Sequence, residues 1–561
     1  MSATRSGRDD AALARDTLLR ATVEAPAEAG IAALAERVGS AVAAAEAPAE
    51  RAEWAERFAS ALVSGRFWPS VPILSNAGRG ADAPLAACFV LAPDDSLDSI
   101  YQTLRRAARI QQGSGGVGLD LSSLRPRGSP IARSGGVSPG PVAFAELAAH
   151  SARINALSGR REGAHLIVLA DSHPDILAFV EAAREAEALR SAGLAVGVSD
   201  ALLDAARRNA FHPLRDPRGA PAGSIAAREL LDAIAAAIRD TGNPTLLFLD
   251  AIAAGNPTPR LGALRASNPC GEQPLLPDES CVLGSLALPA FCDDAGRIDF
   301  AALAESARLA VRFLDDVVEV TGHPDPRCAA AARRTRKVGL GVMGFADLLL
   351  LRGEVYGSPA SLRCAEQVIA RVAREADRAS EALAAERGAY PAREADARER
   401  RNASLLAIAP TGTLRLLAGC SGGIEPWIDP VVSVETADGA THRWVDRTLL
   451  GWLETRAPAP DAVLDALAAG SASEQLPGLG PMQRCLLLRA HEVPAEQQLQ
   501  LQARFQAHVD GGVSKTVHLG PDATAEQIVS LIQRGRALGC KGVAFWRRTG
   551  ATPAACVRCA A

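Results

Sequence analysis

The stretch SNPCGEQPLLPDESC, residues 267–281, places Cys270 and Cys281 eleven residues apart and Glu272 two positions after the first cysteine. A proline and a glycine flank Cys270. Such residues favour a tight loop, which would push the cysteine side chain into a cavity. Together with Cys88 in APLAACFVL, two thiols could act as a two-electron reductant and leave one sulfur to spare. The carboxylate of Glu272 could serve as a general base toward a hydroxyl, so the stretch predicts thiol chemistry.

Composition describes a globular chain and gives no sign of a nucleic-acid partner. The 561 residues are 48% hydrophobic and 22% charged, with a formal net charge of -4. That length allows about three or four ordinary domains or one large barrel. Because there is no basic surplus, we expect no direct binding of nucleic acid.

The sequence also predicts a cytoplasmic location and no membrane segment. Its first sixteen residues, MSATRSGRDDAALARD, alternate charges and contain no apolar core of a signal peptide. No later run reaches the ~18 uncharged apolar residues that a membrane helix needs. Eleven cysteines in a chain of this length are too sparse for a disulfide scaffold. Each is therefore expected to be a buried small hydrophobic residue unless its motif indicates a chemical role.

Three regions follow from the hydrophobic pattern. Residues 1–65 are rich in Ala, Leu, Glu and Arg with helical spacing, which predicts a small helical cap. Over residues 66–548, β-prone runs alternate with helical stretches, as expected of an α/β fold with a sheet or barrel flanked by helices; the runs include ACFVL, AHLIVLA, TLLFLD, KVGLGVMGF, SLLAIAP and CKGVAFW. Residues 549–561 are small and proline-interrupted, and they are expected to form a flexible tail.

Gly113, Gly115 and Gly118 have the spacing of a dinucleotide-binding turn, but their surroundings do not fit one. A helical stretch precedes these glycines and a strand-like run follows, which is the reverse of strand, turn and helix. We therefore expect glycines that pack closely under a ligand or another backbone segment.

A second candidate turn is formed by Pro410, Thr411, Gly412 and Thr413, directly after the apolar run SLLAIA. A turn before a helix presents unpaired backbone N–H groups and hydroxyls at the positive end of the helix dipole, which suits a phosphate. An ordinary N-cap turn would have the same sequence. No histidines have metal-ligand spacing, and no metal bound by protein side chains is expected.

Cys556 and Cys559 form a C-x-x-C pair in the tail. No second pair lies nearby, so a structural zinc site would lack half of its ligands. Exchange with a disulfide elsewhere is favoured, because it needs access and a deprotonated thiol more than a rigid scaffold. A cysteine pair without a role is the alternative.

Taken together, these motifs resemble the ribonucleotide reductases, in particular the adenosylcobalamin-dependent class. The resemblance covers residues 70–545 approximately and keeps the family's order of motifs, which here read PILSNAG, ACFVLAPDDSLDSI, GSGGVGLDLSSLRPRG, SGGVSPGPVAF, RREGAHLIVLADSHPDI, TGNPTLLFLDAI, SNPCGEQPLLPDESCVLGS, RKVGLGVMGFADLL, APTGTLRLLAGCSGGIEP, HVDGGVSKTVHL and ALGCKGVAFWR. It implies a ten-stranded α/β barrel, built from two five-stranded parallel halves set antiparallel. A finger loop would carry a cysteine up its centre.

The resemblance also implies a role for each residue of the opening stretch. Cys270 matches the cysteine whose thiyl radical abstracts the 3'-hydrogen of a ribonucleotide. Glu272 would take the proton of the 3'-hydroxyl, and Asn268 would hydrogen-bond the sugar. Cys88 and Cys281 match the pair that delivers two electrons and ends as a disulfide.

The resemblance also implies what the remaining motifs bind or react with. The Pro410–Thr413 turn resembles the loop that holds the substrate phosphate, with Ser75 and Asn76 in the opposite wall. Cys556 and Cys559 resemble a shuttle that reduces the active-site disulfide and passes oxidation to a thioredoxin-like donor. The substrate would be a ribonucleoside diphosphate or triphosphate.

The number and positions of the tyrosines indicate which radical generator the chain uses. The class that imports a radical from a second subunit uses adjacent tyrosines late in the chain, whereas Tyr101, Tyr356 and Tyr390 are the only tyrosines here. Nothing after residue 500 matches the RVCGY-like loop of the glycyl-radical class. Adenosylcobalamin is therefore the expected cofactor. A reductase fed by a separate radical subunit and a non-catalytic nucleotide-binding relative are the alternatives.

Two further segments fall where the family reads an allosteric nucleotide at a dimer interface. They are RPRGSPIARSGGVSPGP and SGRREGAH, and they imply a homodimer with a deoxynucleotide or ATP effector. Some positions depart from the family pattern: Asp278 replaces a common tyrosine, Val282 a common asparagine, and Gly511 and Gly512 a more usual Asn-Ala. We expect these changes to alter local substrate and loop contacts.

Overall fold

The computed structural model describes residues 30–80, 83–132, 135–156, 164–190, 192–428, 430–435 and 441–547. The predicted tail with Cys556 and Cys559, residues 1–29 of the predicted cap, and most of the SGRREGAH segment lie outside the described residues.

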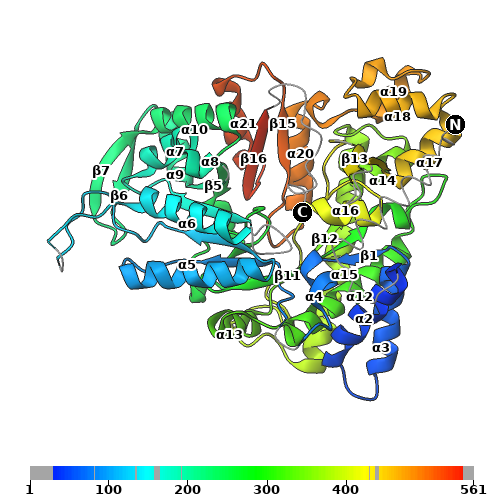
Figure 1. Ribbon diagram of the computed structural model, residues 1–561, viewed down its shortest axis with the longest axis horizontal. Helices are drawn as coiled ribbons and strands as arrows, with labels where there is room; N and C mark the ends of the chain where they lie inside the picture. Colours follow the sequence, from blue (N-terminus) through cyan, green and yellow to red (C-terminus); the bar gives the residue numbers. More distant parts are fainter. Residues whose placement is uncertain are drawn as a thin grey trace.

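The first half of the barrel consists of five parallel strands. They are β2 Cys88–Leu91, β3 Gly116–Asp120, β4 His165–Ala170, β5 Gly193–Val198 and β8 Thr245–Phe248. Their side chains are almost all buried, because helices cover one face and the barrel interior the other. The covering helices are α5 Leu97–Gln112, α6 Pro141–Ala156, α7 Ile176–Glu185, α9 Asp200–Arg207 and α10 Ala227–Thr241 (Figure 1). Ser96 begins α5 as a side-chain N-cap, its hydroxyl accepting a hydrogen bond from the Ser99 N–H.

The second half is also parallel. β11 Ser280–Ala287 pairs with β12 Val338–Met343, and β15 Thr516–Leu519 pairs with β16 Gly542–Arg547. Between these pairs, residues 404–408 make single parallel bridges, Leu340 with Leu406 and Ile408 with Val513. The principal helices of this second half are α12 Phe300–Val320, α15 Pro359–Arg387, α20 Ala495–Gln506 and α21 Ala525–Ala537.

The two halves join through antiparallel contacts. β11 pairs with β2 at one junction, and β16 pairs with β8 at the other. The main sheet has ten strands in the described part of the chain, including β1 Phe67–Pro69, which pairs antiparallel with the end of β11. The predicted α/β barrel of two opposed parallel halves is therefore confirmed.

A finger loop enters this barrel on a short antiparallel stem. The stem strands are β9 Ala266–Ser267 and β10 Pro274–Leu275, and the loop between them contains Cys270. On one side, a Cβ atom at Gly118 of β3 would lie 1.9 Å from the Ser267 carbonyl oxygen. Real Cβ atoms essentially never come that close, so this glycine permits the loop to pass. Close packing under another backbone segment is thus found at Gly118, whereas a Cβ at Gly113 or Gly115 would first meet the side chain of Pro84 or Ile110.

On the other side of the loop, Gly511 and Gly512 fulfil the same requirement. A Cβ at Gly512 would lie 2.5 Å from the carbonyl oxygen of Gly271, and one at Gly511 would lie 2.6 Å from that of Glu272. The Gly512 N–H also donates to the Glu272 carbonyl at 2.7 Å. Gly511 and Gly512 therefore allow a second backbone segment to pack against the finger loop.

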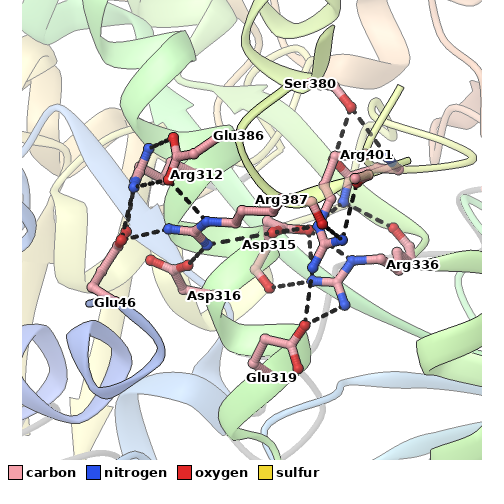
Figure 2. A network of polar contacts seen from close by, with 12 residues as sticks. Glu46, Arg312, Asp315, Asp316, Glu319, Arg336, Ser380, Glu386, Arg387 and Arg401 are labelled. Carbon is pink, nitrogen blue, oxygen red and sulfur yellow. Dashed lines mark hydrogen bonds and ion pairs between the residues drawn. The ribbon is translucent and has the colours of Figure 1, made fainter. Parts of the chain in front are cut away.

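The N-terminal helices dock on α12 through aromatic rings and a buried charge network. α2 Gly30–Val42 and α3 Arg51–Val63 lie beside α12 (Figure 1), and Phe58 stacks edge-on against Phe313 with centroids 5.1 Å apart. Figure 2 shows Arg312 of α12 bound to both oxygens of Glu46, at 2.6 and 2.7 Å, while Glu386 binds the same guanidinium. The predicted helical cap is thus tied to the barrel by residues far apart in sequence.

The rest of the described chain forms connections and one small satellite core. The connections are the hairpin β6 Phe211–Arg215 and β7 Pro221–Ala226, and the helices α4 Val71–Asn76, α8 Glu187–Arg190, α11 Leu249–Ala254, α13 Pro326–Thr335, α14 Phe345–Arg352 and α16 Gly412–Ala418. The satellite core packs against α14 and contains β13 Val431–Glu435, β14 Thr441–Val445, α17 Arg447–Arg456, α18 Pro460–Ala468 and α19 Pro481–Leu486. Among the helices described, none is both long and apolar enough to cross a membrane.

Candidate active site

The finger loop holds its shape through Asn268. The Asn268 Oδ1 atom accepts hydrogen bonds from the Gln273 N–H at 2.9 Å and from the Ser267 hydroxyl at 3.2 Å, and its carbonyl accepts from the Gly271 N–H at 3.0 Å. Gly271 has φ of +82°, a left-handed conformation that glycine adopts without strain. The turn leaves the Cys270 thiol exposed at the tip of the loop.

Glu272 is a buried carboxyl group with one oxygen uncommitted. Its side chain is buried, Oε1 accepts a weak hydrogen bond from the Cys88 thiol at 3.9 Å, and Oε2 has no partner among the described atoms. Burial raises the pKa of Glu272 to about 7, against hydrogen bonds that stabilise its charged form. A carboxyl group with this pKa can exchange a proton near neutral pH.

Cys88 and Cys281 face each other across the junction of the two barrel halves. They are direct partners in the antiparallel register of β2 and β11, and both are free thiols. Directly opposed residues on such strands have Cα atoms ~4.5–5.5 Å apart, which is within the range that a disulfide spans. The Asn268 Nδ2 donates to the Cys88 sulfur at 3.0 Å. Burial raises the pKa of both thiols well above the ordinary value.

Cys88, Glu272 and the finger loop border one cavity of about 130 Å³. Eight residues singled out in the sequence contribute to its wall: Cys88, Asn268, Cys270, Glu272, Pro410, Thr411, Gly412 and Thr413. The finger loop and the Pro410–Thr413 turn, which lie far apart in sequence, therefore form two sides of one site.

The Pro410–Thr413 turn leads directly into α16. Thr411 has a left-handed backbone with φ of +52°, and its hydroxyl oxygen accepts a hydrogen bond from the Gly423 N–H at 2.8 Å. Gly422 allows this contact, because a Cβ there would lie 2.7 Å from the Pro410 carbonyl oxygen. These contacts thus hold the turn against the CSGG segment, residues 420–423. The start of α16 lines the cavity.

Ser75 and Asn76 lie at the far end of α4 from this site. In the described structure they are not among the cavity-lining residues, and the Asn76 amide donates to the Pro84 carbonyl at 2.8 Å. The lining comes from the beginning of α4, where Ser70 is the N-cap residue and its buried hydroxyl has no hydrogen-bond partner in the described chain. Sequence reasoning missed Ser70, although a serine two residues before a proline is a signal of a helix start.

The substituted position Asp278 forms an ion pair at the base of the finger loop. Its carboxylate accepts from Arg106 of α5 at 2.5 Å, and Arg106 also binds Asp325 at 2.5 Å. Asp278 adopts φ of +71°. Among the described residues, no three His, Cys, Asp or Glu side chains gather in a way that could hold a metal ion.

Comparison with known proteins agrees with this geometry. The model of the ribonucleotide reductase barrel domain matches residues 86–400 and 396–546, and that of the ribonucleotide reductase all-alpha domain matches residues 20–81. A vitamin B12-dependent ribonucleoside-diphosphate reductase of Mycobacterium tuberculosis is 42% identical over 92% of this chain and 75% of its own length. The protein of the same name from Thermoplasma acidophilum is 36% identical over 88% of this chain and 65% of its own.

The fold has a counterpart among solved structures. The class Id ribonucleotide reductase alpha subunit of Actinobacillus ureae superposes with a TM-score of 0.79, covering 98% of this chain and 99% of that one at 22% sequence identity. The barrel, the finger loop and the facing cysteines thus occur together in this chain. The family models match both its helical cap and its barrel. The chain belongs to the ribonucleotide reductase family.

Proposed function

We propose that this chain reduces ribonucleotides to 2'-deoxyribonucleotides by thiyl-radical chemistry, with adenosylcobalamin as the radical generator. The observation that carries the proposal is the convergence, in and beside one cavity, of an exposed thiol, a carboxyl group with a pKa near 7 and two facing thiols. The relatives named vitamin B12-dependent ribonucleoside-diphosphate reductases support the cofactor and the reaction.

Each residue has one task in the reaction. A thiyl radical on Cys270 takes the 3'-hydrogen of the ribose, and Glu272 accepts the proton of the 3'-hydroxyl. The 2'-hydroxyl then leaves as water, while Cys88 and Cys281 supply two electrons and two protons and become a disulfide. Cys270 finally returns the hydrogen to C3', so one ribonucleotide and one dithiol yield one deoxyribonucleotide, one water and one disulfide. Asn268, whose amide donates to the Cys88 sulfur and which lines the cavity, is proposed to hydrogen-bond the sugar.

The residues around Cys270 fit a large radical source that reaches the thiol from outside the loop. Cys270 is exposed, and a Cβ built at Gly271 would meet no atom within 4 Å. No tyrosine occurs in residues 391–561, and the late strand β16 carries Phe545 and Trp546. When bound, adenosylcobalamin supplies homolysis of its carbon–cobalt bond, and Cys270 is the residue that it would have to face.

The substrate is proposed to be a ribonucleoside diphosphate or triphosphate held between two helix starts. The beginning of α16, with Pro410–Thr413, and the beginning of α4, with Ser70, line the same cavity. Backbone N–H groups at helix starts are unpaired and attract anions. The uncommitted Ser70 hydroxyl adds a donor to that wall.

A reductant and an effector complete the proposal. Cys556 and Cys559 are proposed to reduce the Cys88–Cys281 disulfide and to be re-reduced by a thioredoxin-like protein. The free thiols suit a reducing compartment, and we place the enzyme in the cytoplasm.

A homodimer is proposed through α5 and α6. These adjacent helices expose Leu97, Tyr101 and Ile154, which are 63%, 55% and 55% accessible. Exposed apolar side chains that gather on neighbouring helices mark an interaction surface. Beside them, Arg125 and Asp95 form an ion pair at 2.8 Å where the family resemblance puts the effector loop. The effector is proposed to be a deoxynucleotide or ATP.

The test is deoxycytidine nucleotide formation by the purified chain with dithiothreitol, a candidate effector, and cytidine diphosphate or triphosphate. The assay is run with and without adenosylcobalamin and without any second protein. Product that depends on the cofactor supports the proposal. Absence of product from both substrates at all effector conditions overturns it.

A further inference from the structure

A buried ion pair lies beside the cysteine pair and takes no part in the reaction described above. Lys337 directly precedes β12, and Glu279 directly precedes β11. The Lys337 Nζ donates to the Glu279 Oε2 at 2.6 Å, and both side chains are at most 2% exposed. The same oxygen accepts from the Leu276 N–H at 2.7 Å, whereas the Glu279 Oε1 has no partner among the described atoms.

Strand register places this lysine beside Cys281. Val282 of β11 pairs with Val338 of β12 in parallel, so Cys281 and Lys337, one residue earlier on each chain, are neighbours on one face. Glu279 lies two residues before Cys281 and therefore on the same face. Burial raises the pKa of Cys281, and the charge of Lys337 is the strongest influence that opposes this increase.

Cys88 has the opposite surroundings. Burial raises its pKa, and the nearby Glu272, Cys281 and Cys270 raise it further, while only the amide of Asn268 lowers it. The two sulfurs therefore differ in charge environment. Lys337 acts on Cys281 against the carboxyl groups of Glu272 and Glu279, whereas Glu272 and the two other thiols act on Cys88.

They also differ in access. Cys88 lines the cavity that contains Cys270, whereas Cys281 is 1% exposed and is not among the lining residues in the described structure. A thiol that enters the cavity meets the Cys88 sulfur first. Thiol–disulfide exchange is faster when the sulfur that leaves is the better stabilised thiolate.

We propose that Lys337 is a positioning residue that makes Cys281 the leaving thiolate when the Cys88–Cys281 disulfide is reduced, so that the incoming thiol attacks Cys88. The inference rests on the proposed function, which supplies the disulfide. The incoming thiolate forms a bond to the Cys88 sulfur, the Cys88–Cys281 bond breaks, and Cys281 keeps the electron pair beside Lys337. The second thiol of the dithiol then attacks the mixed disulfide and releases Cys88. Each cysteine takes up one proton, and the dithiol becomes a disulfide.

The experiment follows exchange alone, without nucleotide or cofactor. In a chain carrying Cys556→Ser and Cys559→Ser, the Cys88–Cys281 disulfide is formed with diamide and verified by peptide mapping. 2-Mercaptoethanol is then added, the reaction is quenched with acid, free thiols are alkylated, and the mixed disulfide is located by mass spectrometry. Reduction by dithiothreitol is timed in parallel between about pH 6 and 9, a range in which the attacking thiol ionises.

The expected adduct is on Cys88, with Cys281 alkylated. Lys337→Met should slow reduction by dithiothreitol about tenfold, because loss of a nearby cation raises the pKa of the leaving thiol. The double variant Lys337→Met/Glu279→Gln removes the uncompensated carboxylate, which covers the case that the single variant does not fold. It should also be slowed, but less than the single variant, because Glu279 raises the pKa of Cys281. Lys515→Met serves as control, because Lys515 is equally buried and pairs with Glu425 at 2.6 Å away from the cysteines. It should exchange like the parent chain.

An adduct on Cys281 in the parent chain, or variants of Lys337 that exchange at the parental rate, would overturn the inference. If the chain exchanges as expected but makes no deoxynucleotide, the proposed function fails and the exchange result stands. If it makes deoxynucleotide but carries the adduct on Cys281, only the inference fails.

Discussion

Burial is the property that suits Glu272 to proton transfer at neutral pH. A glutamate in water is almost fully ionised at pH 7 and a poor proton acceptor, whereas the buried Glu272 has a pKa of about 7. The local motif sufficed to predict Cys270, Glu272 and Asn268 at one site, since they lie within five residues. Sequence could not reveal the protonation behaviour of Glu272, which depends on packing from Cys88 and from residues around position 512.

This pKa predicts the pH dependence of the proposed activity. Proton acceptance requires the carboxylate, so kcat/KM should fall as pH drops below about 7 and approach a tenfold loss per pH unit. Glu272→Gln should lower the rate by about 10²-fold or more and remove this dependence. Glu375→Gln, a change at another buried glutamate that pairs with Arg308, should keep it. An acid limb near pH 4.5, the ordinary range for glutamate, would contradict the assignment.

Among the elements, the finger loop depends most on glycines of other segments, namely Gly118, Gly511 and Gly512. The sequence predicted the runs that became β2, β4, β8, β12 and β16, because buried strands read as continuous apolar segments. It did not predict which end of α4 faces the site: Ser70 lines the cavity, and a role of Ser75 and Asn76 in substrate binding stays a prediction. Nor could it predict that Cys88 and Cys281 are register partners, since strand pairing between distant segments is a property of the closed barrel.

Gly118→Ala tests the close passage of the loop past β3. The new Cβ would lie 1.9 Å from the Ser267 carbonyl oxygen, so the loop must shift and carry Cys270 with it. A displacement of ~1 Å at reacting groups costs about 10²-fold in rate, and kcat should fall by that order while far-ultraviolet circular dichroism stays unchanged.

The matched control is Gly451→Ala in α17, where a Cβ meets nothing within 4 Å. Its activity should equal that of the parent chain, and alanine should slightly stabilise the helix. A Gly118→Ala enzyme with parental kcat would show that the loop tolerates the shift.

At the scale of the whole molecule, the helical cap and barrel form one body through the network in Figure 2. Glu46 is buried, yet hydrogen bonds from Arg312 and the charge of Arg387 outweigh the effect of burial and hold its pKa at about 2. Trp54 packs under Arg312 with its ring centroid 4.0 Å from the guanidinium carbon. The helical character of the cap was predictable from its composition, but its docking surface on α12 was not, because the charged partners are dispersed over more than 300 residues.

Arg312→Met should weaken this docking strongly. It removes two hydrogen bonds to the buried Glu46, which keeps only its ion pair with Arg387, and loss of hydrogen bonds to a charged group costs about 1.5–3 kcal/mol. The midpoint of urea unfolding, followed by tryptophan fluorescence, should fall accordingly. Arg228→Met breaks an exposed pair with Asp232 within α10 and should leave the midpoint nearly unchanged. Equal midpoints for both variants would mean that the network contributes little.

The most direct test of the central claim is deoxynucleotide formation by Cys270→Ser, in the presence of adenosylcobalamin, dithiothreitol, substrate and effector. The serine hydroxyl cannot form the radical that the thiol forms, and because Cys270 is exposed, its replacement should leave the fold intact. The account predicts a folded variant that yields no product while the parent chain turns over. Product at the parental rate from Cys270→Ser would contradict the claim that this thiol initiates the reaction.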